Sequence, residues 1–281
     1  MRLLNTIGEM RAFSSQAQMR DRVLGLVPTM GALHEGHLSL VRVARERCNS
    51  VVVSIFVNPT QFGPNEDFEK YPRNIDRDCE LLEREHVDAV FAPSAEEMYS
   101  PGAVSWVTVE GMSDRLCGKS RPGHFRGVTT VVCKLFNVVQ PEIAFFGQKD
   151  AAQVAIIRRM VRDLNVPVAI EVGPIVREAD GLAMSSRNAY LTPAERKSAL
   201  VLYRSLQRAQ QLFDRGERSA EKLIAAGAHE FQSEPSARLD YFELVDPDSL
   251  QPISTISRGA LVAVAGFVGK TRLIDNVLLN P

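Results

Sequence analysis

Residues 23–37, Val23-Leu-Gly-Leu-Val-Pro28-Thr-Met-Gly-Ala-Leu-His34-Glu-Gly-His37, decide the fold class of this chain. The apolar run 23–28 is typical of a buried β-strand, and the residues after it turn into a helix start. Such a turn presents backbone N–H groups and the positive end of the helix dipole, which suit a phosphate group. His34 and His37 should project to one side of the helix, where they could donate hydrogen bonds to phosphate oxygens. The segment therefore predicts a phosphate-binding site at the end of a strand.

The histidine pair has two competing interpretations. H-E-x-H is similar to the zinc-binding pattern H-E-x-x-H, but the spacing is one residue short and no third ligand is evident. An isolated pair of histidines could also simply cap the helix or face solvent. The buried strand directly before the pair favours phosphate binding, with Gly31 and Gly36 allowing close approach of the backbone to a ligand. We therefore predict no metal site in the protein itself.

Strand-like and helix-like segments alternate through the first part of the chain. Short runs rich in β-branched residues predict buried strands, and apolar residues spaced three and four apart predict helices. The predicted strands are 23–28, 51–57, 88–92, 143–146 and 167–172, and the predicted helices are 37–47, 74–86, 128–139 and 150–163. Alternation of this kind predicts an α/β fold, with a parallel sheet covered by helices on both sides.

The pattern changes after about residue 176. A helix is predicted from Thr192 to about Phe213, because Thr192-Pro-Ala-Glu195 has the features of a helix start. A second helix over 219–231 and strands over 238–245, 260–268 and 271–279 follow. We therefore expect two domains, a sheet domain over 1–175 and a small α+β domain over 176–281 that closes over the site. The loop 58–74 is long enough to be a binding loop or lid.

Composition excludes several classes of protein. The chain has 281 residues with a formal net charge of −1, so no overall field attracts it to nucleic acid or to an anionic membrane. Its four cysteines are irregularly spaced, which argues against a disulfide framework and favours reduced thiols. The longest apolar run, 260–268, is far shorter than the roughly 20 residues of a membrane helix. Because no signal peptide is evident either, we expect a cytoplasmic protein.

A second polar cluster follows the strand predicted over 143–146. Lys149 could reach phosphate oxygens, Asp150 could accept hydrogen bonds from ribose hydroxyls, and Gln153 should lie on the same helix face. Taken alone, Lys149 and Asp150 fit a solvated helix start equally well. A basic loop formed by Arg121, His124 and Arg126 either binds an anion or supports the structure. The segment 104–109 is strand-like, and we expect Trp106 within it to pack rather than to bind a ligand.

The histidine motif is similar to the H-x-G-H signature of the nucleotidylyltransferase superfamily, in which a Rossmann-like sheet holds ATP. That superfamily has a second signature, K-M-S-K-S. Here the matching segment is Ala183-Met184-Ser185-Ser186-Arg187, so both lysine positions are replaced and Arg187 supplies the cation. The resemblance therefore implies that Lys149 meets part of the phosphate charge.

The full set of motifs is more specific. PTMGALHEGH, FVNPTQFGPNEDFEKYPR, RPGHFRGV, FFGQKD and READGLAMSSRN, in this order, closely resemble the pantothenate synthetase family. The resemblance covers nearly the whole chain and implies that ATP activates pantoate as an acyl adenylate, which the amine of β-alanine then attacks. It also implies Mg²⁺ bridging the ATP phosphates, a homodimer, and no nucleic-acid or membrane partner.

The resemblance also implies roles for individual residues. His37, His34, Lys149 and Arg187 would act on the phosphates, with His37 as the proton donor. Gln61 and Gln153, and less strongly Asn58, would hold pantoate. Residues assigned to ATP are Met30, Gly31, Ala32, Leu33, His34, Glu35, Gly36, His37, Gly147, Gln148, Lys149, Asp150, Val176, Met184, Ser185, Ser186 and Arg187.

Two other functions compete with the ligase. An adenylyltransferase acting on a phosphorylated acceptor would use the same signature, but the neutral amides Gln61 and Gln153 favour a small polar acid. A nucleotide-sensing module without turnover would not need two histidines together with Lys149 and Arg187. A role with transfer RNA is disfavoured by the balanced charge.

Overall fold

The computed structural model describes residues 1–19, 23–64 and 66–280. Its larger sheet has six parallel strands in the order β1-β4-β3-β2-β5-β6. The strands are β1 (Arg2–Leu4), β2 (Leu24–Thr29), β3 (Ser50–Ile55), β4 (Ala89–Phe91), β5 (Ile143–Gly147) and β6 (Ala169–Gly173). Five of the six coincide with predicted strands to within three residues at each end, so the predicted α/β fold is confirmed.

Helices cover both faces of this sheet. Alternate residues of β2 separate to the two sides: Leu24 and Leu26 join one core cluster and Val27 joins another. The first cluster is covered by α1 (Ile7–Gln18), α6 (His124–Val139) and α7 (Ala151–Asp163), and the second by α2 (Glu35–Arg47) and α3 (Ile75–Arg84). Shorter helices are η1 (Pro59–Gln61), α4 (Ala95–Met98), α5 (Cys117–Ser120) and η2 (Gln148–Asp150).

The strand order changes direction at β2 and β5, which places a crevice beyond the carboxyl ends of these two strands. The chain passes from β2 to β3 on one side, whereas β5 pairs with β2 on the other side. In open parallel sheets, ligands bind beyond the carboxyl ends of the strands where the order changes direction. The histidine motif follows β2 and the Lys149 motif follows β5, so the two predicted halves of the site meet at this crevice.

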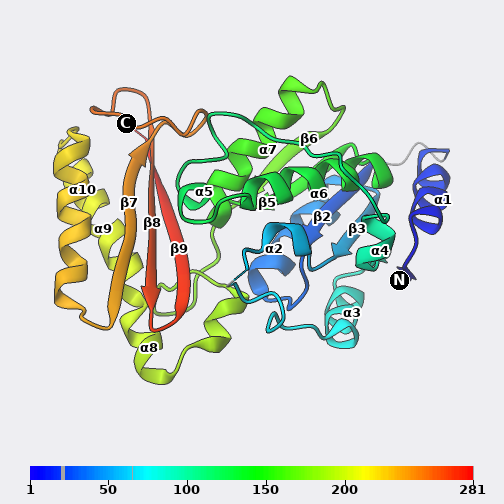
Figure 1. The fold of residues 1–281 in the computed structure, drawn as a ribbon, viewed down its shortest axis with the longest axis horizontal. Helices are drawn as coiled ribbons and strands as arrows, with labels where there is room; N and C mark the ends of the chain where they lie inside the picture. The colour runs from blue at the N-terminus through cyan, green and yellow to red at the C-terminus, as the bar shows by residue number, and fades with distance from the viewer. Residues whose placement is uncertain (20–22, 65, 281) are drawn as a thin grey trace.

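A second, antiparallel sheet lies beside the first, with α8–α10 around it (Figure 1). Its elements are η3 (Ser186–Tyr190), α8 (Pro193–Ser198), α9 (Leu200–Asp214), α10 (Ala220–His229), η4 (Glu230–Ser233), β7 (Ala237–Val245), β8 (Ala260–Val268) and β9 (Thr271–Leu279). Val262 and Val264 of β8 pack with α9 and α10, whereas Leu261 and Ala263 join the core of the larger sheet. The small sheet is thus packed on both faces.

Three local features differ from the sequence-based predictions. No prediction covered β1 or α1, although Thr6 and Glu9 form a capping box at the start of α1. The helix predicted from Thr192 is interrupted at Ala199, where Leu202 N–H bonds to the Ala199 carbonyl in a tighter turn.

The segment 104–109 is not a strand of either sheet. Side chains of α6 take the place of a strand partner: Thr130 Oγ1 accepts from Val107 N–H, and Thr129 Oγ1 donates to the Val107 carbonyl. Trp106, expected to pack rather than to bind a ligand, is 44% exposed, and the Arg126 guanidinium lies 4.7 Å from its ring centre.

All four cysteines are free, and Cys48 and Cys117 are buried. No helix within the described ranges is long and apolar enough to cross a membrane.

A buried ion pair joins the segment after β6 to β9. Arg177 lies 2.6 and 3.0 Å from the two carboxylate oxygens of Asp275, whose side chain is 2% exposed. We expect Arg177→Ala to lower the free energy of unfolding by about 3 kcal/mol, because it leaves a buried carboxylate without its partner. Urea denaturation measures this. Arg159→Ala removes the exposed pair with Asp163 and should cost less than about 1 kcal/mol; equal losses in the two variants would contradict the prediction.

Candidate active site

A buried carboxylate holds the turn after β2. Asp78 of α3 is 1% exposed, and its two oxygens accept the N–H groups of Ala32 (2.8 Å) and Leu33 (2.9 Å). Gly31 and Ala32 both have positive φ, 79° and 50°. A Cβ atom on Gly31 would lie 3.0 Å from Asp78 Oδ2, so glycine suits both the conformation and the close approach. The N–H groups of Ala32 and Leu33 are therefore committed to Asp78 and are not available to a phosphate.

The two histidines cap the helix that follows. His34 is the N-cap of α2, and its Nδ1 accepts from Gly36 N–H at 3.2 Å. His37 Nδ1 accepts from His34 N–H at 3.4 Å, and the two ring centres are 4.1 Å apart. Because each Nδ1 is an acceptor, we assign the proton of each neutral ring to Nε2. The capping interpretation and the ligand-binding interpretation are thus compatible: Nδ1 caps the helix and Nε2–H remains a donor.

The surroundings of both rings favour the neutral form. Burial, with a smaller effect of Lys149, lowers the pKa of His34 to about 4. Burial, with smaller effects of His34 and Lys149, lowers the pKa of His37 to about 3. Near neutral pH in the ligand-free protein the two rings are therefore hydrogen-bond donors without positive charge.

The cationic groups of the site come from other segments. Lys149 follows β5, and its Nζ lies 3.8 Å from Asp150 Oδ1. Arg187 makes two hydrogen bonds to Asp67, at 2.8 and 2.9 Å, and its guanidinium lies 5.9 Å from the ring centre of Tyr71. Ser186 donates to the Ala32 carbonyl at 3.1 Å, so the 184–187 segment is fastened to the turn after β2.

One pocket of about 220 Å³ brings most of the predicted residues together. Those lining it are Met30, His34, Gly36, His37, Asn58, Gln61, Gly147, Lys149, Asp150, Gln153, Val176, Met184, Ser185, Ser186 and Arg187. Gly31, Ala32, Leu33, Glu35 and Gln148 are outside this lining. Glu35 instead pairs with Arg42, and Gln148 bonds to Asn276 of β9.

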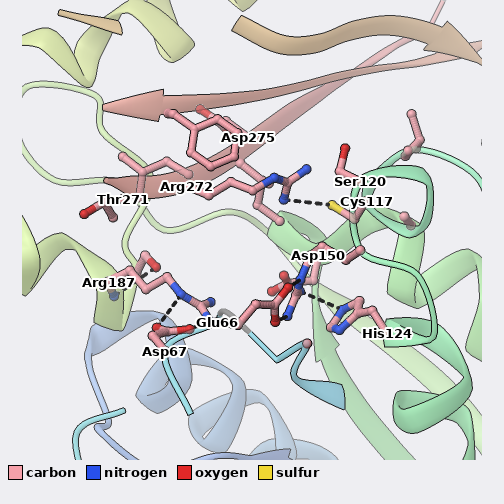
Figure 2. Close-up of a pocket in the computed structure, with 18 of the residues that line it drawn as sticks. Glu66, Asp67, Cys117, Ser120, His124, Asp150, Arg187, Thr271, Arg272 and Asp275 are labelled. Atoms are coloured by element: carbon pink, nitrogen blue, oxygen red, sulfur yellow. Dashed lines mark hydrogen bonds and ion pairs between the residues drawn. The ribbon is translucent and has the colours of Figure 1, made fainter. Parts of the chain in front are cut away.

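A larger cleft of about 1360 Å³ shares Lys149, Asp150, Gln153 and Arg187 with this pocket. Figure 2 shows Glu66, Asp67 and Arg187 on one side of this cleft and residues of β9 on the other. It lies between the 58–74 loop and the small antiparallel sheet, and it leads to the histidine pocket through the shared residues.

The basic loop before α6 supports the 58–74 loop. Arg121 makes hydrogen bonds of 2.6 and 2.7 Å to Glu66, and its third donor group lies 3.0 Å from His124 Nε2. His124 Nδ1 lies 2.9 Å from the main-chain carbonyl of Gln61. Burial, with a smaller effect of Arg121, lowers the pKa of His124 to about 4. Arg121 and His124, left open between two roles, thus contact the loop as structural supports and also line the pocket.

Sequence reasoning missed the apolar wall of the pocket. Val128, Val131, Val132 and Leu135, all on one face of α6, line it. The three-and-four spacing of these residues was a usable signal, but the same spacing is typical of ordinary core packing. Tyr71 was also missed. Within the described residues, no cluster of three or more metal-ligating side chains is present.

Stability should fall on acidification because of the buried imidazoles. An unfolded histidine binds its proton near pH 6.5, whereas His34, His37 and His124 in the folded protein do so only near pH 3 to 4. The unfolded state therefore binds more protons in this window, and the free energy of unfolding should decrease as pH falls from about 6.5 to about 4. His37→Gln should flatten this dependence, measured by urea denaturation at several pH values. His86→Gln, at an exposed position, is the control; an unchanged slope in His37→Gln would contradict the prediction.

Comparison with known proteins agrees with this geometry. The family model for pantoate-beta-alanine ligase matches residues 2–278. The pantothenate synthetase of Koribacter versatilis is 58% identical over the whole chain and 96% of its own length, and that of Thermotoga neapolitana is 58% identical over the whole of both. A crystal structure of the Thermus thermophilus pantothenate synthetase has a TM-score of 0.95 at 46% identity, covering both chains fully. The Francisella tularensis pantoate-beta-alanine ligase, complexed with beta-gamma ATP and beta-alanine, has a TM-score of 0.81 at 34% identity, covering 99% of this chain and 97% of that one. The chain therefore belongs to the pantoate–β-alanine ligase family.

Proposed function

We propose that this protein joins (R)-pantoate to β-alanine at the expense of ATP, through a pantoyl adenylate. The observation that carries the proposal is the meeting of His34, His37, Lys149 and Arg187 with the amide of Gln61 in one pocket, in a chain that matches the ligase family over nearly its full length. A carboxylate is a poor electrophile, so activation is needed before an amide can form.

The reaction has two balanced steps. A pantoate carboxylate oxygen attacks the α-phosphorus of ATP, and the bond to the β-phosphate oxygen breaks to release pyrophosphate. The amine of β-alanine, in its unprotonated form, then attacks the acyl carbon, the bond to the AMP oxygen breaks, and the nitrogen releases its proton to solvent. Positioning of the reactants can supply effective molarities of about 10⁵ M or more, so no covalent nucleophile of the protein is required.

The phosphate-facing groups have distinct roles. We assign the Nε2–H groups of His34 and His37 as neutral hydrogen-bond donors to phosphate oxygens. Because the pKa of His37 is lowered to about 3, His37, which the resemblance implied as the proton donor, would act here by donating a hydrogen bond and not by transferring its proton. Lys149 and Arg187 supply the positive charge, and Arg187 must share its hydrogen bonds with Asp67 or exchange them for phosphate oxygens. Buried donors aimed at developing charge are effective because they need no reorganisation during reaction.

The remaining ATP contacts follow from the pocket lining. We infer that Gly147 and Asp150 meet the ribose and that Val176 meets adenine through its backbone. Met184, Ser185 and Ser186 would cover the phosphates together with Arg187, beside the turn after β2 to which Ser186 is bonded. Mg²⁺ would arrive with ATP on the phosphate oxygens.

Pantoate has a place between the amides and the apolar wall. Gln61 and Gln153 would hold its polar groups, while the apolar face of α6 would pack on its two methyl groups. Asn58 lines the same pocket but has its hydrogen bonds committed elsewhere, so we place it behind Gln61.

We further infer that residues 176–281 form a closing domain and that the enzyme works in the cytoplasm, where ATP is available. A homodimer is proposed as well. Val104 and Trp106, 84% and 44% exposed, lie in a segment with the composition of a strand that pairs with neither sheet. A second copy would cover this exposed apolar segment.

The activity is tested with purified protein, ATP, pantoate and β-alanine. We expect AMP formation to require both acid and amine, and labelled pyrophosphate to exchange into ATP with pantoate alone. A dinucleotide product would indicate the adenylyltransferase alternative, and nucleotide binding without turnover would indicate the sensing module. Either result would overturn the proposal.

The role of His37 gives a sharper test. His37→Ala should lower kcat of adenylate formation by about 100-fold or more, because it removes a buried donor to the reacting phosphate. Pyrophosphate exchange measures this step, and the thermal unfolding midpoint checks folding. His229→Ala, which removes an exposed histidine, is the control. A loss below about threefold in His37→Ala would exclude the assigned role.

Oligomeric state is tested by light scattering after size-exclusion chromatography. The unmodified protein should elute as a dimer, and Trp106→Glu should shift it toward monomer because a charge at an apolar interface is costly. Ile75→Glu changes a 37% exposed residue at the start of α3, away from the 104–109 segment, and should leave the dimer intact. A monomeric unmodified protein would disprove the dimer.

A further inference from the structure

A buried asparagine connects Gln61 to residues far from the pocket. Asn58, 1% exposed, caps η1 immediately after β3. Its Oδ1 atom accepts from Tyr99 Oη at 2.9 Å, from Thr60 Oγ1 at 2.9 Å and from Thr60 N–H at 3.4 Å. Its Nδ2 atom donates to the Gly127 carbonyl at 3.1 Å and to Gln61 Oε1 at 3.0 Å. All the hydrogen-bonding positions of this side chain are therefore used within the protein.

Two main-chain groups determine which way the Asn58 amide faces. The N–H of Thr60 can only donate and the carbonyl of Gly127 can only accept, so Oδ1 must face Thr60 and Nδ2 must face Gly127. The geometry around them is tight, since a Cβ atom on Gly127 would lie 2.4 Å from the Thr60 carbonyl oxygen. A flipped Asn58 would set donor against donor and acceptor against acceptor.

The orientation of Asn58 then determines that of Gln61. Because Asn58 Nδ2 is a donor, the Gln61 atom beside it must be the acceptor Oε1. Gln61 Nε2 is left on the other side, 3.1 Å from Met30 Sδ, and both Gln61 and Met30 line the pocket. A thioether is a weak acceptor and takes one hydrogen at most, so the second N–H of Gln61 is available to a ligand.

We propose that Tyr99 is a positioning residue: its hydroxyl holds Asn58 in the orientation that the main-chain groups of Thr60 and Gly127 set, and through Asn58 it keeps the Gln61 amide with its NH₂ group toward the substrate. Tyr99 follows α4. The centre of its ring lies 6.3 Å from the ring centre of Phe56 and 5.5 Å from Lys134 Nζ. The Tyr99 hydroxyl donates to Asn58 Oδ1 and also lies 3.2 Å from Thr60 Oγ1. Asn58 in turn donates to Gln61 Oε1, which leaves the Gln61 NH₂ group as the donor that faces the pocket.

The direction of this chain restricts the ligand. A group facing Gln61 Nε2 must be an acceptor, such as a carboxylate or hydroxyl oxygen, and not the ammonium group of an amine. This inference rests on the proposed function, in which Gln61 holds pantoate, and it assigns to Gln61 an oxygen atom of the acid.

The test compares Michaelis constants in steady-state kinetics. Tyr99→Phe removes only the hydroxyl and should raise KM for pantoate about fivefold to tenfold, the effect of one weakened hydrogen bond, with KM for ATP unchanged. Tyr203→Phe removes a tyrosine hydroxyl in α9 and is the matched control. A general loss of structure would instead change both constants and lower the thermal unfolding midpoint.

A double-mutant cycle shows whether Tyr99 acts through Gln61. Gln61→Ala should raise KM for pantoate, and adding Tyr99→Phe to it should cause no further rise. Additive effects, or an unchanged KM in Tyr99→Phe, would overturn the inference while leaving the ligase activity established. If Gln61→Ala itself leaves KM for pantoate unchanged, the pantoate-binding role of Gln61 fails and the inference fails with it.

Replacement of the donor face gives an independent check. Gln61→Glu keeps an oxygen toward Asn58 but turns an oxygen toward the substrate, so it should weaken pantoate binding more than Gln61→Ala does. Equal or tighter binding in Gln61→Glu would mean that an acceptor is tolerated at this position, which would overturn the assignment of the donor face.

Discussion

The carboxylate of Asp78 is the contact on which the site depends. A buried carboxylate is stable only when its oxygens are hydrogen-bonded, and here the partners are the N–H groups of Ala32 and Leu33. The contact holds Gly31 and Ala32 at positive φ, a conformation that costs free energy for the non-glycine residue. That turn sets where α2 begins, and thus where His34 caps it.

The electrostatics of the pocket follow from this arrangement. Neutral imidazoles donate without adding charge, so the cationic groups that would balance phosphates are Lys149 and arginines fastened to the 58–74 loop. Two consecutive acids of that loop, Glu66 and Asp67, hold Arg121 and Arg187 respectively. Under the proposed function, a triphosphate entering the pocket would compete with Asp67 for Arg187, and this competition would couple the position of the loop to the charge of the pocket.

Local patterns in the sequence predicted five of the six parallel strands, and together with the family resemblance they named most of the residues that line the pocket. Apolar runs bounded by turns marked β2 and β5, and the polar residues just after them had to meet because parallel strands end at one edge. The pattern did not predict that Leu33 turns away from the pocket, because its partner Asp78 lies 45 residues further on. It also misjudged 104–109, since side chains of α6 satisfy the backbone of Val107 where a strand was expected.

The orientation of a side-chain amide could not be predicted from the composition of the chain or from the spacing of its residues. Asparagine and glutamine present both a donor and an acceptor, so naming Gln61 as a ligand residue leaves open which atom faces the ligand. Only the series of hydrogen-bond partners shows which atom of Gln61 faces the pocket. The series begins at the N–H of Thr60, which can only donate, and at the carbonyl of Gly127, which can only accept. The direction in which Gln61 presents its donor group can therefore originate in contacts outside the pocket, and Tyr99, which is not part of the pocket lining, makes one of them.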